Sequence, residues 1–214
     1  KAAKAMLSIL ALFGLSGCAT IPQRGAVYYT TANIWYTDPR DIRTTNYHEG
    51  AMIPFGSKVT IESLNPRGLR FKTANDITFY MTYMSQHSAI TMREHFDRYF
   101  SVDDPAKSGS QFDGFSDMEK ENIREGNVSL GMSKAAVLAA YGYPPSHRTP
   151  DLNADFWRYW TKFRQEAHVL FEDGKVVKLE RLAVVGPPPG LKKLTSDLVY
   201  RNSTEHFMDM QQNP

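Results

Sequence analysis

One stretch of the chain, from Gly126 to Pro145, constrains the fold more than any other. Ser133 is a strong N-cap residue, because its hydroxyl can accept a hydrogen bond from a free backbone N–H of the first helical turn. Strong helix formers follow, and Gly142 is suited to a left-handed position after the helix, which Pro144 prevents from continuing. Spacings of three and four predict one apolar stripe, made of Val137, Leu138, Ala140 and Tyr141. The stretch therefore predicts a short packing helix without a reactive group.

Two features downstream predict a sheet that packs on this helix. Residues 156–160 (FWRYW) have the aromatic density of a strand. Asp173-Gly174 separates two β-rich runs, 166–171 and 175–185, and such a dipeptide predicts a two-residue type I′ hairpin. The second half of the chain should therefore carry three antiparallel strands.

The hairpin also predicts a register. A two-residue turn pairs Phe171 with Val176 and Leu170 with Val177. One face of the hairpin would then carry Leu170, Val177 and Leu179, and the other Val169, Phe171 and Val176. Both faces are partly apolar, so the pattern leaves open which one is buried.

Two further helices are predicted from their capping boxes, in which an N-cap hydroxyl and a Glu three residues later satisfy each other's end donors. Ser116 and Glu119 form one box, starting a helix that ends near Gly126. Thr91 and Glu94 form the other. In the Thr91 helix the apolar face contains Met92, Phe96, Tyr99 and Phe100, with His95 and Asp97 away from it. Between the helices, residues 103–114 are polar and contain Gly and Ser, as expected of a linker.

The first half of the chain is rich in short strands. Alternation and β-rich composition predict them at 26–30, 33–36, 58–64, 69–72 and 76–83, and residues 51–55 form a brief apolar stretch ended by Gly56. Asn65-Pro66-Arg67-Gly68 has the residues of a type I turn. So many short strands in about sixty residues favour a small barrel or open sheet, and an α+β class for the whole chain.

The beginning of the chain has the layout of a secretory signal. Lys1 and Lys4 precede an apolar run that is shorter than the ~20 residues of a membrane-spanning helix, and small residues follow it. Without residues 1–17, the body carries 23 basic and 23 acidic side chains. This balance gives no electrostatic reason to expect nucleic acid as a partner.

The residues Leu15-Ser16-Gly17-Cys18 resemble the lipobox of bacterial lipoproteins. The resemblance implies that Cys18 is acylated and begins the mature protein. Cys18 is also the only cysteine, so it has no disulfide partner within the chain. By the sorting rule of such lipoproteins, Ala19 implies an outer-membrane location with the body in the periplasm, and an anchor of several acyl chains would hold it there.

Residues 116–185 resemble the SmpA/OmlA family of outer-membrane lipoproteins (BamE-like proteins). The resemblance rests on Gly126, Gly131-Met132-Ser133, Val137, Gly142, Pro144, Trp157, Tyr159, Val169, Phe171 and Asp173-Gly174-Lys175-Val176. It implies two helices followed by three antiparallel strands, in a module that binds other envelope proteins. More loosely, Asn33 and residues 52–61 resemble bacterial SH3-like domains.

Together these features predict six segments. They are a signal peptide (1–17), a lipidated tether (18–23), an SH3-like β domain (24–86), a helix and linker (87–114), a BamE-like domain (115–186) and a flexible tail (187–214).

Residues able to do chemistry are sparse. The densest group of possible ligands is His87, Glu94, His95 and Asp97, and its spacing matches no zinc motif. We interpret the group as a solvated helix face. The sequence also lacks a nucleophile elbow, a P-loop and a dinucleotide fingerprint. These observations predict a protein that is not an enzyme and has no metal or cofactor.

Aromatic residues gather in the first domain: Tyr28, Tyr29, Trp35, Tyr36 and Tyr47. Such residues either fill a small core or form a contact patch, and Trp35, Tyr36 and Tyr47 are the candidate partner contacts. The leading hypothesis is a non-catalytic, outer-membrane-anchored scaffold or subunit of an envelope complex, in β-barrel assembly, secretion or a flagellar ring. The alternative is a peptidoglycan-binding lipoprotein that uses the SH3-like domain. A third hypothesis, a periplasmic hydrolase, requires a polar pocket that joins His87, His95 and acidic partners.

Overall fold

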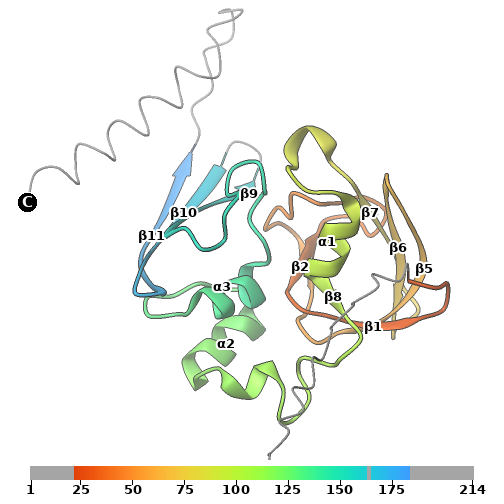
Figure 1. The fold of residues 1–214 in the computed structure, drawn as a ribbon, viewed down its shortest axis with the longest axis horizontal. Coiled ribbons are helices and arrows are strands. Elements are labelled where there is room, and N and C mark those ends of the chain that lie inside the picture. The colour runs from red at the N-terminus through yellow and green to blue at the C-terminus, as the bar shows by residue number, and fades with distance from the viewer. Residues whose placement is uncertain (1–21, 163–164, 184–214) are drawn as a thin grey trace, which may run out of the picture.

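The computed structural model describes residues 22–162 and 165–183, which form two lobes side by side (Figure 1). The N-terminal lobe, residues 22–101, is built mainly of strands, and the C-terminal lobe, residues 115–183, packs two helices on a three-stranded sheet. Each lobe has its own cluster of buried apolar side chains. The predicted α+β class is confirmed.

The N-terminal lobe is organised around a six-stranded sheet with the order β3-β7-β6-β5-β1-β8. β3 and β7 are parallel, and all other neighbours in this sheet are antiparallel. The strands are β1 (Val27–Thr30), β3 (Ile42–Arg43), β5 (Lys58–Asn65), β6 (Gly68–Thr73), β7 (Thr78–Thr82) and β8 (Phe100–Ser101). A separate two-stranded ladder joins β2 (Ile34–Tyr36) to β4 (Ala51–Ile53). The two-residue strands β3 and β8 were not predicted, because so short a strand has no alternation to detect.

The helix α1 (Met92–Tyr99) packs on this sheet and begins with the predicted capping box of Thr91 and Glu94. Its buried residues include Met92, Phe96 and Tyr99, as predicted. His95 is also buried, with 4% of its surface exposed, so its assignment to a solvated face was wrong. The reason is geometric, since a residue three positions after Met92 lies on the same side of a helix.

The C-terminal lobe begins with α2 (Asp117–Glu125), which has the predicted capping box at Ser116 and ends at Gly126 in the left-handed conformation. α3 (Lys134–Tyr141) begins at Ser133 as predicted. It is buried on more than one stripe, because Ala136 and Ala139 are buried as well, whereas Leu138 is only partly buried.

The end of α3 differs from the prediction. Gly142 has a positive φ of 74°, as expected, but its ψ of −169° is not that of a left-handed helical residue. This combination of angles is essentially restricted to glycine. The extended ψ directs the chain away from the helix axis at once, toward the Pro144-Pro145 segment.

The three-stranded sheet has the order β11-β10-β9, with β9 (Phe156–Lys162), β10 (Gln165–Glu172) and β11 (Lys175–Ala183). Asp173 and Gly174 both have positive φ values, 49° and 73°, as a type I′ turn requires. The predicted pairing of Phe171 with Val176 is confirmed.

The next predicted pair is wrong, because a β-bulge lies between Leu170 and Phe171. Leu170 pairs with Lys178, and Val177 is the extra residue, exposed over 39% of its surface. The bulge moves Leu179 to the side of Val169, where it packs against the core. The buried face is therefore that of Val169, Phe171 and Val176, which answers the question that the sequence pattern left open.

Two short 3-10 helices, η1 (Ser85–His87) and η2 (Gln111–Gly114), complete the described elements. The predicted linker, residues 103–114, contains η2, and Phe112 packs beside Phe55 and Phe115. The predicted signal peptide, Cys18 and the tail 187–214 lie outside the described residues. Within residues 22–162 and 165–183, none of the helices is both long and apolar enough to cross a bilayer.

Candidate functional site at the seam between the lobes

The two lobes meet where the C-terminal end of α3 points into the N-terminal lobe. We call this contact the seam; it joins residues 33–48, 87–88 and 99 of the N-terminal lobe to residues 123–126, 139–147 and 160 of the C-terminal lobe. A helix leaves its last four carbonyl groups without partners inside the helix. In α3 these groups are satisfied largely by side chains and backbone of the other lobe, so the seam is built on hydrogen bonds that the helix itself cannot make.

Asn33 lies at the centre of the seam and is fully buried. Its backbone N–H donates to the carbonyl of Ala139 at 2.9 Å. Its side-chain Nδ2 donates to the carbonyls of Ala140, at 2.9 Å, and Ile123, at 2.7 Å. Its Oδ1 accepts from the N–H of Phe55 at 2.7 Å. One residue therefore joins the ends of both helices to the strand-rich lobe.

Two residues of the loop after β3 complete the end of α3. Asn46 has a positive φ of 47° and is buried; its Oδ1 accepts from the N–H of Trp35 at 3.0 Å and its Nδ2 donates to the carbonyl of Tyr141 at 3.1 Å. His48 donates from Nε2 to the same carbonyl at 2.9 Å. Burial lowers the pKa of His48 to about 4, although the hydrogen bond to Tyr141 opposes the shift. His48 is thus a neutral donor at neutral pH.

Two of the glycines in the α2–α3 stretch, Gly126 and Gly142, are in close contact with residues of the N-terminal lobe. A Cβ on Gly126 would lie 2.5 Å from the indole of Trp35. A Cβ on Gly142 would meet the Nδ2 of Asn46 and would lie 3.0 Å from the hydroxyl of Tyr99. That hydroxyl accepts from the N–H of Tyr143 at 2.9 Å. Neither position has room for a side chain, so the glycines also serve the seam.

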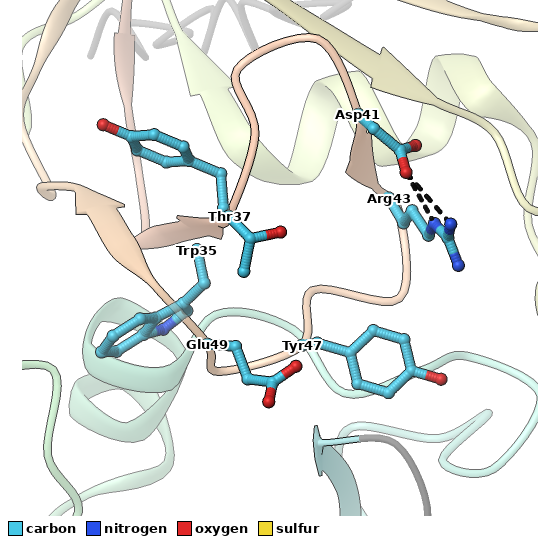
Figure 2. A pocket seen from close by; sticks show the side chains of 7 residues that line it. Trp35, Thr37, Asp41, Arg43, Tyr47 and Glu49 are labelled. Atoms are coloured by element: carbon cyan, nitrogen blue, oxygen red, sulfur yellow. Dashed lines mark hydrogen bonds and ion pairs between the residues drawn. The ribbon is translucent and has the colours of Figure 1, made fainter.

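The predicted partner contacts Trp35, Tyr36 and Tyr47 line one pocket of about 260 Å³, together with Thr37, Asp41, Arg43 and Glu49 (Figure 2). All three aromatic residues are partly buried. Figure 2 shows the rings of Trp35 and Tyr47 pointing to opposite sides of Glu49. The Trp35 ring reaches Gly126, and Tyr36 packs edge-on against Phe79 at 5.0 Å. The pocket is therefore lined by rings that also pack within the fold.

Tyr47 extends from this pocket to a second aromatic group around Trp160. The two rings stack with their centroids 5.9 Å apart. His87 and His147 contact the same indole, with centroid distances of 4.9 and 5.0 Å. These residues come from four separate segments of the chain, and their contacts close one end of the seam.

The residues considered for a metal or hydrolase site are not brought together. Glu94 closes the capping box with Thr91, and Asp97 pairs with Arg93 at 2.9 Å. His95 contacts the hydroxyl of Ser88 at 2.9 Å, whereas His87 faces Trp160. Across the described residues, no group of three or more His, Cys, Asp or Glu side chains could hold a metal ion.

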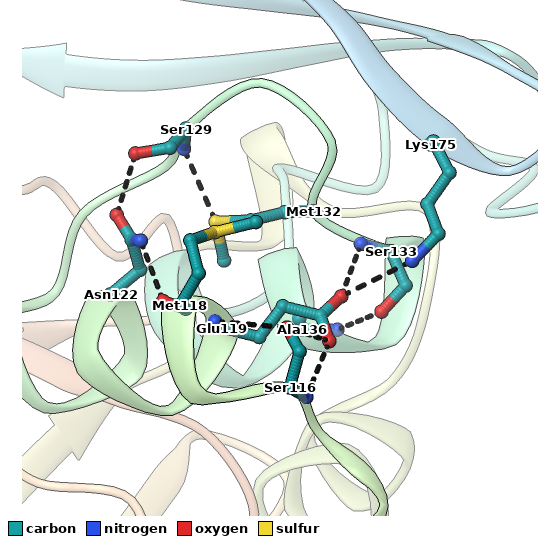
Figure 3. Close-up of polar contacts among 9 residues, drawn as sticks. All are labelled: Ser116, Met118, Glu119, Asn122, Ser129, Met132, Ser133, Ala136 and Lys175. Carbon is teal, nitrogen blue, oxygen red and sulfur yellow. Dashed lines mark hydrogen bonds and ion pairs between the residues drawn. The ribbon is translucent and has the colours of Figure 1, made fainter.

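A second polar centre lies within the C-terminal lobe, at the carboxylate of Glu119 (Figure 3). Its Oε1 accepts from the N–H of Ser133 at 2.7 Å, and its Oε2 accepts from the N–H of Ser116 at 3.0 Å. Lys175 lies 3.5 Å away. Burial alone would raise the pKa of Glu119, but the hydrogen bonds from Ser133 and Ser116 lower it to about 2. One carboxylate therefore caps the beginnings of both α2 and α3.

No family model, curated protein or solved structure matches this chain. The role of the seam therefore has to follow from its own chemistry. Its polar groups are aimed at backbone groups of the same chain, so the arrangement is suited to holding two lobes in a fixed relation.

Sequence reasoning missed the seam. Asn33 was noticed only as part of the SH3-like pattern, and Asn46 and His48 were not among the candidate residues. Their partners lie 107, 95 and 93 residues away along the chain. A local sequence pattern cannot reveal such long-range contacts. The one available signal is an asparagine in an otherwise apolar segment, together with a helix that ends at a glycine.

Proposed function

We propose that this chain is an outer-membrane lipoprotein that acts as a non-catalytic scaffold in an envelope complex. Its N-terminal lobe is an SH3-like domain and its C-terminal lobe a BamE-like domain of the SmpA/OmlA type. The observation that carries the scaffold role is the seam, in which Asn33, Asn46 and His48 all serve the end of α3. Two lobes held in this way offer partners one composite surface.

The proposed anchor fits the short distance between Cys18 and the folded body. Pro22 is buried in the N-terminal lobe and lies only four residues after Cys18. Four residues span at most about 14 Å when fully extended. A lipid on Cys18 would therefore keep the N-terminal lobe close to the bilayer surface and leave the C-terminal lobe for partners farther into the periplasm.

The anchor is tested by a Cys18→Ser variant of the precursor expressed in a bacterium with an outer membrane. We expect palmitate labelling to be lost and the protein to move from the outer-membrane fraction to the soluble periplasmic fraction. The matched control is Ala19→Asp, which should stay labelled but remain at the inner membrane. A Cys18→Ser protein that still sediments with outer membranes would overturn the anchor.

The scaffold role is tested by photocrosslinking in intact cells. Leu130 and Ile77 are the most exposed large apolar side chains of the C-terminal and the N-terminal lobe, at 63% and 43%. A photoreactive residue at each position should capture the same envelope complex if the two lobes act as one body. Crosslinks to no envelope protein from either position would count against a scaffold.

Peptidoglycan binding is the second candidate function, and the pocket of Tyr36 and Tyr47 favours it, because aromatic rings beside carboxylates suit sugars. Retention on purified sacculi should then be lost in Tyr36→Ala and Tyr47→Ala. Tyr80→Ala is the control, since Tyr80 is exposed on β7 and is not one of the residues that line the pocket. Equal retention of all three variants would exclude this pocket as the binding site.

A further inference from the structure

The histidines of the described chain are distributed unevenly. Four of the five, His48, His87, His95 and His147, contact the seam or lie one hydrogen bond from it. The fifth, His168 on β10, makes no direct contact with the seam; it pairs with Glu166 at 3.0 Å, and Glu166 accepts from the indole of Trp160 at 3.2 Å. Because histidine is the side chain that changes charge just below neutral pH, such a distribution gives a contact between lobes a specific sensitivity to acid.

His48 is enclosed by residues of three elements of the C-terminal lobe and one of the N-terminal lobe. Its ring lies 4.1 Å from the ring of Tyr141 on α3, and 5.6 Å from those of both Tyr159 on β9 and Trp35 on β2. The charged group that acts on it is Arg181 of β11, which bonds the Tyr141 hydroxyl. A proton on His48 would add a second positive charge there without a facing carboxylate.

His87 and His147 face each other across the seam, with ring centroids 5.4 Å apart. Both rings meet the Trp160 indole edge-on. The charged groups acting on His147 are Arg148, His87 and, with the opposite sign, Glu166. A proton on His147 would add a positive charge beside the Arg148 guanidinium, at the contact between the two lobes.

His95 reaches the seam through two hydroxyl groups. Its Nε2 contacts the Ser88 hydroxyl, which lies 3.3 Å from the Ser146 hydroxyl of the C-terminal lobe. Ser146 also accepts from the N–H of Ala89 at 2.8 Å. Arg98 and Glu94 are the charged neighbours of His95, and Tyr83 packs edge-on against its ring.

We propose that the seam is an acid-responsive joint, in which protonation of these histidines releases the C-terminal lobe from the N-terminal lobe while both lobes stay folded. Each lobe has its own cluster of buried apolar side chains, and opening the seam would expose the hydrogen-bonding groups described above together with aromatic side chains that pack across it, such as Phe55 and Tyr143. The proposal does not depend on the scaffold role.

The direction of the effect follows from the buried rings. Burial lowers the pKa of His48 and of His95 to about 4, and burial followed by the charge of Arg148 lowers the pKa of His147. The opened seam would return the pKa values of His48 and His147, which contact the other lobe directly, toward the ordinary value of 6.5. The open form therefore binds more protons between these values, so the closed form is favoured above pH 6.5 and is lost progressively as the pH falls toward 4.

Amide hydrogen exchange measured by NMR tests the joint in the full chain with Cys18→Ser. The N–H groups of Asn33 and Tyr143 are direct reporters, since each bonds across the seam. After correction for intrinsic exchange, we expect their protection to fall about tenfold or more from about pH 7 to about pH 5. Protection in the β5–β6 and β10–β11 ladders should change much less over the same range.

The variants His48→Gln and His147→Gln should reduce the loss of protection, because glutamine does not take up a proton, and the amide of His48→Gln can still donate to the Tyr141 carbonyl. His168→Gln is the matched control and should behave like the parent protein. Equal loss of protection in the seam and in both ladders would overturn the proposal, as would an unchanged pH response in the double variant of His48 and His147. His147→Gln keeps the test valid if His48→Gln folds poorly, since His147 is only partly buried.

Discussion

Asn33 carries more of the contact between the lobes than any other single side chain. Its side chain satisfies two carbonyl groups of the C-terminal lobe and one N–H of its own lobe, and the residue is fully buried. Asn33 matters for stability mainly because its loss would leave buried polar groups without partners. The free-energy cost of each unpaired group is larger than the net gain from one hydrogen bond.

Asn33→Ala should therefore lower the free energy of unfolding by about 3 kcal/mol or more, since each unpaired buried group costs about 1 to 3 kcal/mol. Urea unfolding measures this change. Asn127→Ala is the matched control, because Asn127 is exposed and contacts Glu125, and its effect should stay within about 0.5 kcal/mol. Equal effects of the two substitutions would show that the Asn33 contacts do not stabilise the protein.

At the scale of elements, the parts that depend on neighbouring residues could be predicted from the sequence. The capping boxes of α1 and α2, the N-cap of α3 and the Asp173-Gly174 turn all rest on residues within a few positions of each other. The bulge beside Leu170 could not be predicted, because it adapts β11 to the core and has no local signature. The burial of His95 and the ψ angle of Gly142 could not be predicted either, because both depend on contacts with residues that are distant in the sequence.

Gly142 and Gly174 both have positive φ values but differ in their surroundings. Replacing each by alanine therefore separates the cost of the backbone conformation from the cost of steric crowding. At Gly174 a Cβ would meet nothing within 4 Å, so Gly174→Ala should cost only about 1 kcal/mol for its φ. At Gly142 a Cβ would meet Asn46, Tyr99 and Asn33 as well, and Gly142→Ala should cost about 3 kcal/mol or more. Thermal unfolding of both variants checks the order, which would be refuted by equal losses of stability.

At the scale of the whole molecule, stability should fall with acid in two stages. Between pH 6.5 and about 4 the unfolded chain takes up protons that buried His48 and His95 exclude. Between pH 4.5 and about 2 the unfolded chain takes up a proton that Glu119 refuses in the folded state. The pKa shift of Glu119 corresponds to roughly 3 kcal/mol, present above pH 4.5 and lost below it.

Urea unfolding at a series of pH values measures both stages. Glu119→Gln should weaken the protein at neutral pH and flatten the pH dependence below about 4.5, because its amide does not titrate. Glu121→Gln, on the exposed side of α2, is the control and should leave the profile unchanged. A Glu119→Gln profile with the same slope as the parent below pH 4.5 would contradict the assignment.

The seam also sets an order of events during synthesis. The groups that complete the end of α3 come from residues 33, 46 and 48, which leave the ribosome before the helix does. Closing a loop of this length is a slow step, whereas the strands of the first lobe pair over short distances. The first lobe can thus fold early, with the polar groups of residues 33, 46 and 48 already in place, and the end of α3 binds to them afterwards. A chain interrupted before residue 139 would lack the end of α3. The amide groups of Asn33 and Asn46 would then be exposed to water and could bind the carbonyl end of another helix.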